Sequence, residues 1–258
     1  MKRDILKDAK VEATGNIEVN GVVEGAEIYT NGNLTVHGGI TQTEYRKIVV
    51  EGSIHAKFIL GGNIQADKDI TVDSEIVNST VKTLGAVIIP EGRIVGGEIT
   101  ALRGIFVGHA GTRASIPTVL IAGENYRIGK KLLLKRNKIQ RIEDELAKLK
   151  NIADTFTSKN GSTSTHNQEE YTKILEKITE TEQKLQSLID ELEDTMSREM
   201  NRAKQLIVVG KMLYPKTILC LGNEKLSVDE ERSGPIQAEL VKGELTLRSQ
   251  NDDGDKKT

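Results

Sequence analysis

Residues 52–72 read GSIHAKFILGGNIQADKDITV and contain the local pattern that recurs through the first half of the chain. A glycine and a small or polar residue are followed by an aliphatic residue and then by strict alternation, as in residues 54–56 and 70–72. Alternation at period two predicts a strand with one buried face. We expect the glycines of this pattern to form tight turns with positive φ.

The same pattern occurs on both sides of this stretch, at loosely repeated intervals. No helix-period segment separates the short strands, which argues against an ordinary parallel sheet with crossover helices, and an antiparallel sandwich favours longer strands. Short strands with turn glycines predict a parallel β-helix (β-solenoid) over residues 4–124, with coils of about 17–20 residues in about six layers. Residues 44–47 are expected to form a loop or bulge. The pattern starts at Gly15, Gly32, Gly52, Gly62 and Gly92.

Near Asn125 the apolar period changes from two to between three and four residues. This spacing predicts two helices whose apolar stripes form a coiled-coil seam. The polar segment 158–168 interrupts the pattern and is expected to form the tip of a hairpin. We therefore predict a long antiparallel coiled-coil hairpin at 126–205, inserted in a mainly β fold. The seam residues are Leu132, Ile139, Ile142, Leu146, Leu149, Ala153 and Phe156, then Tyr171, Ile174, Ile178, Thr181, Leu185, Leu188, Leu192 and Met196.

Strand-like alternation returns after Lys204, at residues 206–209, 217–221, 225–228 and 244–247. The end of a solenoid presents unpaired backbone groups that template aggregation unless they are covered. We expect segment 206–249 to complete the β-helix or to cap its open end. The polar tail 250–258 is expected to be disordered.

Bulk composition argues against an ordinary globular enzyme. Aromatic residues make up 3% of the 258 residues, whereas such enzymes use aromatic area in the core and the pocket. The formal net charge of −2 gives no bulk attraction to nucleic acid or membranes. Cys220 is the only cysteine, which fits a reducing compartment. Because neither a signal peptide nor a membrane-spanning apolar stretch is found, we expect a cytoplasmic protein.

Several short segments occur in a characteristic order around the helical region. GRIVGGEITA (92–101), GHAGT (108–112) and PTVLIAG (117–123) precede it, and Tyr214-Pro215 and ILCLG (218–222) follow it. In order and spacing they resemble the C-terminal region of the bacterial flagellar assembly protein A family, over nearly the whole chain. The resemblance implies a right-handed winding of the β-helix and an inserted coiled coil.

What the resemblance implies about function is support or localisation of flagellar assembly through protein contacts. It brings no catalytic residue and no cofactor to this chain, and no partner is identified beyond flagellar assembly or polar localisation components. Family members usually carry a further N-terminal domain, whereas this chain begins almost directly in the β-helix, so an activity housed there is not carried over. We expect a homo-oligomeric scaffold.

Motifs for chemistry are weak, so we predict no catalytic, cofactor-binding or metal-binding residue. Residues 123–131 resemble a phosphate loop, but the glycine spacing is wrong and Lys131 stands where Ser or Thr is required. None of the four histidines has metal-ligand spacing.

Two solenoid-enzyme alternatives stay open. A six-residue period at Ile64, Ile70 and Ile76 is compatible with an acyltransferase that uses a coil-edge histidine as general base. The acid pairs Asp67/Asp69 and Asp73/Glu75 are compatible with a polysaccharide lyase. Outward polar positions of ordinary strands explain both patterns more simply.

Two sets of helix residues are candidates for contacts with other molecules. An apolar set lies beside the seam and indicates a partner helix or a second copy, although the hairpin base could also use it against the solenoid. A basic set, with no acid between residues 125 and 142, is a candidate anion-binding surface for nucleic acid or lipid, although an acidic run at 190–194 can pair with it instead. The apolar set is Leu133, Leu134, Leu175, Ile189 and Met200. The basic set is Arg127, Lys130, Lys131, Lys135, Arg136, Lys138 and Arg141.

Overall fold

The computed structural model describes residues 4–42, 46–159, 165–202 and 205–249, with the side chains of residues 129–131, 156–159, 165–168 and 198–202 excepted. The chain divides into two compact units. Met1–Tyr126 and Arg202–Thr258 make up the first, which is built of strands; Arg127–Asn201 makes up the second, which is helical. The expected loop residues 44 and 45, the hairpin tip at 160–164 and the tail 250–258 lie outside the described residues.

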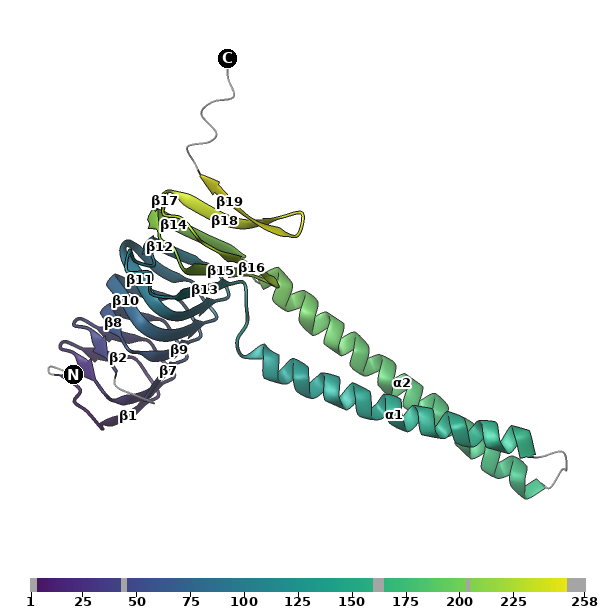
Figure 1. Ribbon diagram of the computed structural model, residues 1–258. Helices are drawn as coiled ribbons and strands as arrows, with labels where there is room; N and C mark the ends of the chain where they lie inside the picture. The colour runs from purple at the N-terminus through teal and green to yellow at the C-terminus, as the bar shows by residue number, and fades with distance from the viewer. Residues whose placement is uncertain (1–3, 43–45, 160–164, 203–204, 250–258) are drawn as a thin grey trace, which may run out of the picture. The chain divides into compact units, whose positions relative to one another are not determined.

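The longest strands of the first unit are β10 and β11 in its middle (Figure 1). In chain order they are β1 (Lys10–Ala13), β2 (Ile17–Val19), β3 (Val23–Glu24), β4 (Glu27–Thr30), β5 (Leu34–Val36), β6 (Ile40–Thr41), β7 (Lys47–Val50), β8 (Ile54–Leu60), β9 (Asn63–Ala66), β10 (Ile70–Thr83), β11 (Val87–Ala101), β12 (Ile105–Ala110), β13 (Thr118–Ala122), β14 (Leu206–Leu213), β15 (Thr217–Leu221), β16 (Glu224–Ser227), β17 (Arg232–Ser233), β18 (Ile236–Val241) and β19 (Glu244–Ser249).

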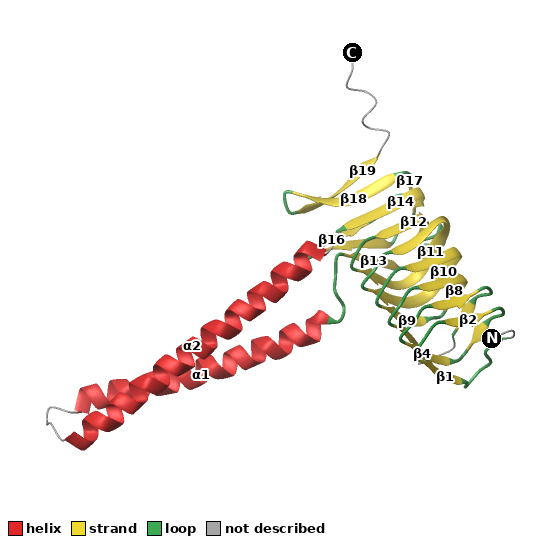
Figure 2. Ribbon diagram, turned by 180° about the vertical axis from the view of Figure 1, so that it is seen from behind, coloured by secondary structure: helices red, strands yellow, loops and turns green. Residues whose placement is uncertain are grey.

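Parallel pairing stacks these strands into a solenoid with three sides (Figure 2). One side runs β1–β4–β7–β9–β10–β11–β13–β15. The long strands β10 and β11 continue around the corners and serve the other two sides as well, with a register shift between those two sides. Six turns precede the helices, which confirms the predicted β-solenoid of about six layers. The paired column on the first side is Val11, Ile28, Ile48, Ile64, Val81, Ile99, Leu120 and Leu219.

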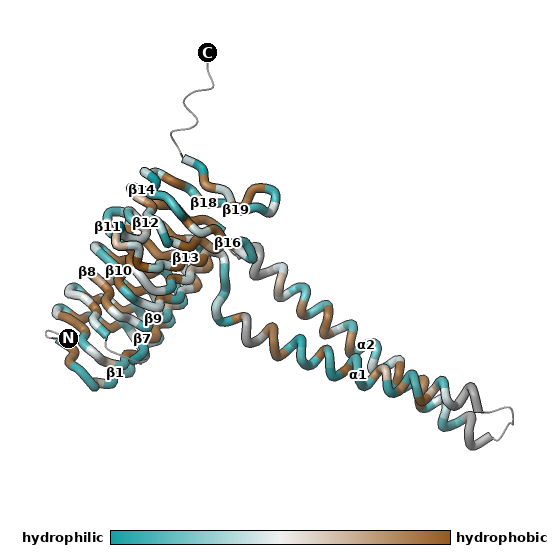
Figure 3. Tube along the Cα trace, viewed as in Figure 1, coloured by the Kyte–Doolittle hydropathy of each residue, from teal (hydrophilic) through white to brown (hydrophobic). Residues whose placement is uncertain are grey.

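The core is a set of aliphatic columns inside the solenoid. Ile48, Ile64, Val81, Ile99 and Leu120 in the first column are all 0% exposed. Brown and teal alternate along the strands in Figure 3, as expected when every second residue points inward. Because each coil contributes flat layers of Ile, Val and Leu, the core needs no large aromatic side chains.

The glycine-polar pairs form turns that stack on one another from coil to coil. Asn33 N–H donates to Asn16 Oδ1 (2.8 Å) and Ser53 N–H donates to Asn33 Oδ1 (2.9 Å). The expectation of positive φ is wrong for the glycines of these pairs, which are absent from the residues with positive φ. At Gly52, glycine is required by close approach instead, since a Cβ there would lie 2.3 Å from Asn33 Oδ1.

The C-terminal strands change from parallel to antiparallel pairing. β14 and β15 add to β12 and β13 in parallel and so extend the solenoid. β16 then pairs antiparallel with β15, and β17 and β18 pair antiparallel with β14. β18 and β19 form a hairpin whose Ala238 and Leu247 pack on the core. The strand at β18 is an element that the sequence analysis missed.

Candidate interaction surfaces

The helical unit consists of α1 (Ile128–Lys159) and α2 (Thr165–Arg202). Lys135 Nζ lies 3.0 Å from Glu191 Oε1, and Lys150 Nζ lies 2.8 Å from Glu182 Oε1. From the first ion pair to the second, the residue number rises in α1 and falls in α2, so the two helices run antiparallel along this stretch. They lie side by side in Figures 1 and 2.

Burial in this unit follows the predicted seam closely. Ile142, Ala153 and Thr181 are buried, and the other described seam residues are half-buried with one exception. Met196 is 37% exposed, whereas its neighbour Thr195 is half-buried. The exposure of Met196 does not fit the seam position predicted for it, whereas the exposure of Thr195 does.

The apolar candidates beside the seam differ in exposure. Leu133 and Leu134 are 58% and 60% exposed, and Leu175 is 42% exposed. Ile189 is half-buried, and the side chain of Met200 lies outside the described residues. The sequence analysis missed Ile152, which is 44% exposed, because only the position of α2 reveals which flank of α1 it leaves uncovered.

The basic candidates divide into a paired and an unpaired group. Lys135 is held by Glu191 and also donates to Thr195 Oγ1 (3.3 Å). The exposed cations with no ion pair to any described side chain are Arg136, Lys138 and Arg141. Arg127 is exposed and precedes α1, and the side chains of Lys130 and Lys131 lie outside the described residues. Among the basic candidates whose described contacts are given above, the acidic run pairs with Lys135, whereas Arg136, Lys138 and Arg141 are in solvent.

The outer surface of the solenoid carries His37 and His55, each beside a carboxylate. His37 Nε2 lies 2.8 Å from Glu18 Oε1, and His55 Nε2 lies 3.6 Å from Asp73 Oδ1, all on outward positions. His37 is the hydrogen-bond donor that lowers the pKa of the Glu18 carboxyl below its ordinary value. Within the described part of the chain, no group of three or more His, Cys, Asp or Glu side chains is arranged to hold a metal ion.

The acid pairs of the lyase alternative have structural partners. Asp69 Oδ1 accepts a hydrogen bond from Ala86 N–H (2.8 Å) in the next turn, and Glu75 forms an ion pair with Arg93 (2.7 Å). Such outward contacts between successive coils stabilise the stack rather than arrange an acid and a base around a substrate.

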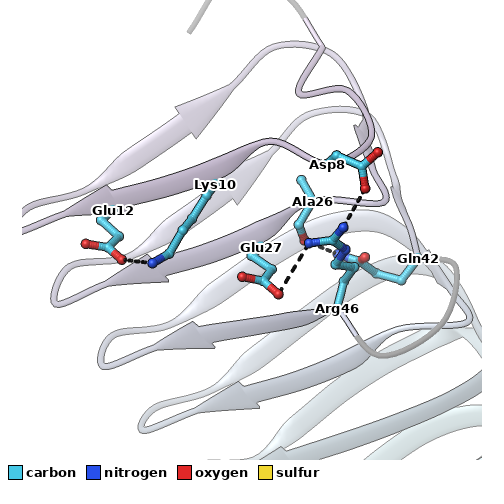
Figure 4. Close-up of polar contacts among 7 residues, drawn as sticks. All are labelled: Asp8, Lys10, Glu12, Ala26, Glu27, Gln42 and Arg46. Atoms are coloured by element: carbon cyan, nitrogen blue, oxygen red, sulfur yellow. Dashed lines mark hydrogen bonds and ion pairs between the residues drawn. The ribbon is translucent and has the colours of Figure 1, made fainter.

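A polar corner near the N-terminal end links three successive coils (Figure 4). Arg46 lies between the carboxylates of Asp8 and Glu27, and its Nη1 is 3.5 Å from Glu27 Oε1. The buried Gln42 donates to the carbonyl of Ala26 (2.9 Å). An open hollow of about 360 Å³ lies beside this corner on β1, β4 and β7. The ion pairs of the polar corner lie at the surface and contribute little to stability, and the hollow is open rather than enclosed. We therefore interpret this corner as a weak contact between coils and not as a binding site.

The family model of the flagellar assembly protein A beta solenoid domain matches residues 2–245. The chain belongs to this family. The match spans both the solenoid and the helical unit, so the sequence resemblance is confirmed over most of the chain. No curated protein and no solved structure matches. Among the described residues, no helix is long and apolar enough to cross a membrane.

Proposed function

We propose that this chain is a non-enzymatic scaffold or localisation factor of flagellar assembly, which acts in the cytoplasm through protein–protein contacts and self-association. Family membership supports the link with flagellar assembly. The observation that carries the contact role is the exposed pair Leu133 and Leu134 on α1, because adjacent large apolar side chains in water mark a surface that another molecule covers.

The finer architecture belongs to the same proposal. The two helices form an antiparallel coiled-coil hairpin at 126–205, and the solenoid winds right-handed, as the resemblance implies. Support for the hairpin comes from the two ion pairs between α1 and α2 and from burial at three-four spacing. A coiled coil with apolar residues outside its seam is suited to recruit a further helix.

The partner surface comprises Leu133, Leu134, Leu175 and Ile189, and the occupant is a helix of a second copy or of an assembly component. Leu175 and Ile189 are 14 residues apart, which is two heptads, so they lie on one stripe of α2. Leu133 and Leu134 extend the apolar surface on α1.

Light scattering after size exclusion tests the proposal on the intact chain and on a variant with residues 130–203 replaced by a short Gly-Ser turn. We expect the intact chain to be a dimer or larger, with the helices contributing to its size. The double variant Leu133→Ser/Leu134→Ser should lose that association and keep its helicity by circular dichroism. A Ser variant as large as the intact chain would contradict a partner role for these leucines.

A second candidate function, binding of an anionic polymer or lipid, is favoured by the unpaired cations Arg136, Lys138 and Arg141. Changing all three to Gln should weaken binding to anionic vesicles or RNA and reduce its salt dependence. The matched control is Lys148→Gln/Lys173→Gln/Lys177→Gln, which removes three other exposed cations of the two helices. Equal binding by both variants would rule out this surface.

A further inference from the structure

The two ends of the solenoid differ in how their terminal strands are paired. At the C-terminal end, β16, β17 and β18 pair antiparallel with the strands of the last coil, and β19 pairs antiparallel with β18. At the N-terminal end, β1 pairs with β4 alone and β2 pairs with β5 alone among the described strands. A parallel stack that ends in this way presents a row of backbone donors and acceptors that accepts another strand.

Exposure at this end agrees with an uncovered edge. Val11 belongs to the column whose next members, Ile28 and Ile48, are 2% and 0% exposed, yet Val11 itself is only half-buried. Leu6 is 63% exposed, the highest value among the large apolar side chains that the structure describes. The aliphatic column therefore stops at Val11 with part of its last layer in water.

The direction of the backbone groups of β1 follows from its hydrogen bonds with β4. Ala9 C=O accepts from Glu27 N–H (2.9 Å), and Ala13 C=O accepts from Asn31 N–H (3.2 Å). Because backbone groups alternate sides along a strand, the N–H and C=O of Lys10 and Glu12 point away from β4. These are the groups that an added strand would bind.

We propose that β1 is an interface between two copies of this chain, which join their N-terminal ends through antiparallel pairing of β1 centred on Val11. Lys10 of one copy then lies opposite Glu12 of the other, in both halves of the pair. Each such pair exchanges two backbone hydrogen bonds, because Lys10 and Glu12 carry the edge-facing groups.

The charges select this register and this occupant. Lys10 and Glu12 are exposed and form an ion pair within one strand, with Nζ 2.8 Å from Oε1. Centring the pairing on Lys10 or on Glu12 instead would place like charges opposite each other, which destabilises a sheet. In the antiparallel register the charges of β1 are complementary to those of another β1, so a second copy of the chain fits this edge. The two half-buried Val11 side chains would continue the apolar column.

This interface is independent of the helices and goes beyond the association proposed for them. A position-specific cross-link therefore separates the two. In the centred register the two Val11 residues form a non-hydrogen-bonded pair with Cβ atoms about 4.5–5.5 Å apart, which is near the reach of a disulfide. Lys57 provides the control, since it is exposed but lies in β8, which is paired on both sides.

The first experiment oxidises the full chain carrying Val11→Cys in a Cys220→Ser background. We expect a disulfide-linked dimer from Val11→Cys and none from Lys57→Cys in the same background. No dimer from Val11→Cys, or equal dimer from both variants, overturns the proposal. Failure of the helix-mediated association leaves this readout unchanged, so the two outcomes can be told apart.

The second experiment uses charge reversal and light scattering. Lys10→Glu alone and Glu12→Lys alone each place like charges opposite one another twice, so each should weaken association at this end about tenfold or more. An equimolar mixture of the two variants restores both attractive pairs and should associate like the unmodified chain, whereas Lys57→Glu should change nothing. A mixture no stronger than its components overturns the antiparallel register.

Discussion

The ammonium group of Lys135 lies 3.0 Å from the carboxylate of Glu191 and joins α1 to α2 by a contact at the edge of the apolar seam. Lys135 lies three residues after Leu132 and four before Ile139, so it occupies a seam position, and its side chain is 28% exposed. A polar residue at such a position fixes the register of a coiled coil at some cost in stability.

Lys135→Leu should therefore stabilise the helices while it loosens their register. Glu191 is 61% exposed and stays solvated without its partner, so removing the cation costs little. We expect the thermal midpoint of the helical signal at 222 nm to rise, corresponding to about 1 kcal/mol from the buried leucine. Lys138→Leu, at an exposed position, should leave the midpoint unchanged. A lower midpoint for Lys135→Leu would show that the ion pair outweighs apolar packing.

Two glycines in equivalent turns should differ in how much stability they lose when changed to alanine. A Cβ at Gly52 would lie 2.3 Å from Asn33 Oδ1 and 2.4 Å from Gly32 C=O, so Gly52→Ala should cost about 1–3 kcal/mol. At Gly15 nothing lies within 4 Å, so Gly15→Ala should stay within about 0.5 kcal/mol of the parent. Urea unfolding midpoints compare the two variants, and equal losses would contradict close approach as the reason for glycine.

The glycines also show which features of the fold the sequence pattern predicts and which it does not. Alternation and glycine spacing predicted the solenoid, because the inward positions are aliphatic in every coil. The reason for glycine at Gly52 was missed, since contact with the preceding turn depends on stacking that a local pattern does not contain. β18 was missed because it follows Gly234-Pro235, which is typical of a loop, and contains Ala238 and Glu239, which are poor strand formers.

The candidate surface was predictable to a smaller extent. The sequence placed Leu175 and Ile189 beside the predicted seam, because the three-four spacing of the seam is written in the sequence. Their role in binding a partner stays a prediction. Whether Thr195 or Met196 enters the seam depends on the rotation of α2 against α1, and both choices satisfy three-four spacing. The exposure of Ile152 depends on the same rotation, so it emerges only from the packed helices.

The side chain of Thr83 should stabilise the fold through the hydrogen bonds of its hydroxyl group, beyond what a side chain of the same shape would contribute. Thr83 is fully buried, donates to Lys68 C=O and accepts a hydrogen bond from Gly85 N–H (3.0 Å). Val50 occupies the same column two coils earlier, so valine fits this layer. Thr83→Val should destabilise by about 1–3 kcal/mol, because it leaves a buried N–H unpaired. Thr80→Val, at an exposed position of the same strand, is the control and should be neutral in urea unfolding.

The thiol of Cys220 should react more slowly than an ordinary cysteine. Cys220 lies on an outward position of β15, and burial raises its pKa above the ordinary value, while Lys225 opposes and Glu124 adds to that rise. The thiolate is the nucleophile, so at pH 8 the rate with iodoacetamide should fall below that of a free cysteine peptide and climb as pH increases further. Lys225→Gln removes the opposing cation and should slow the reaction, whereas Glu124→Gln should accelerate it. The opposite order of these two variants would mean that access, rather than the thiol pKa, limits the rate.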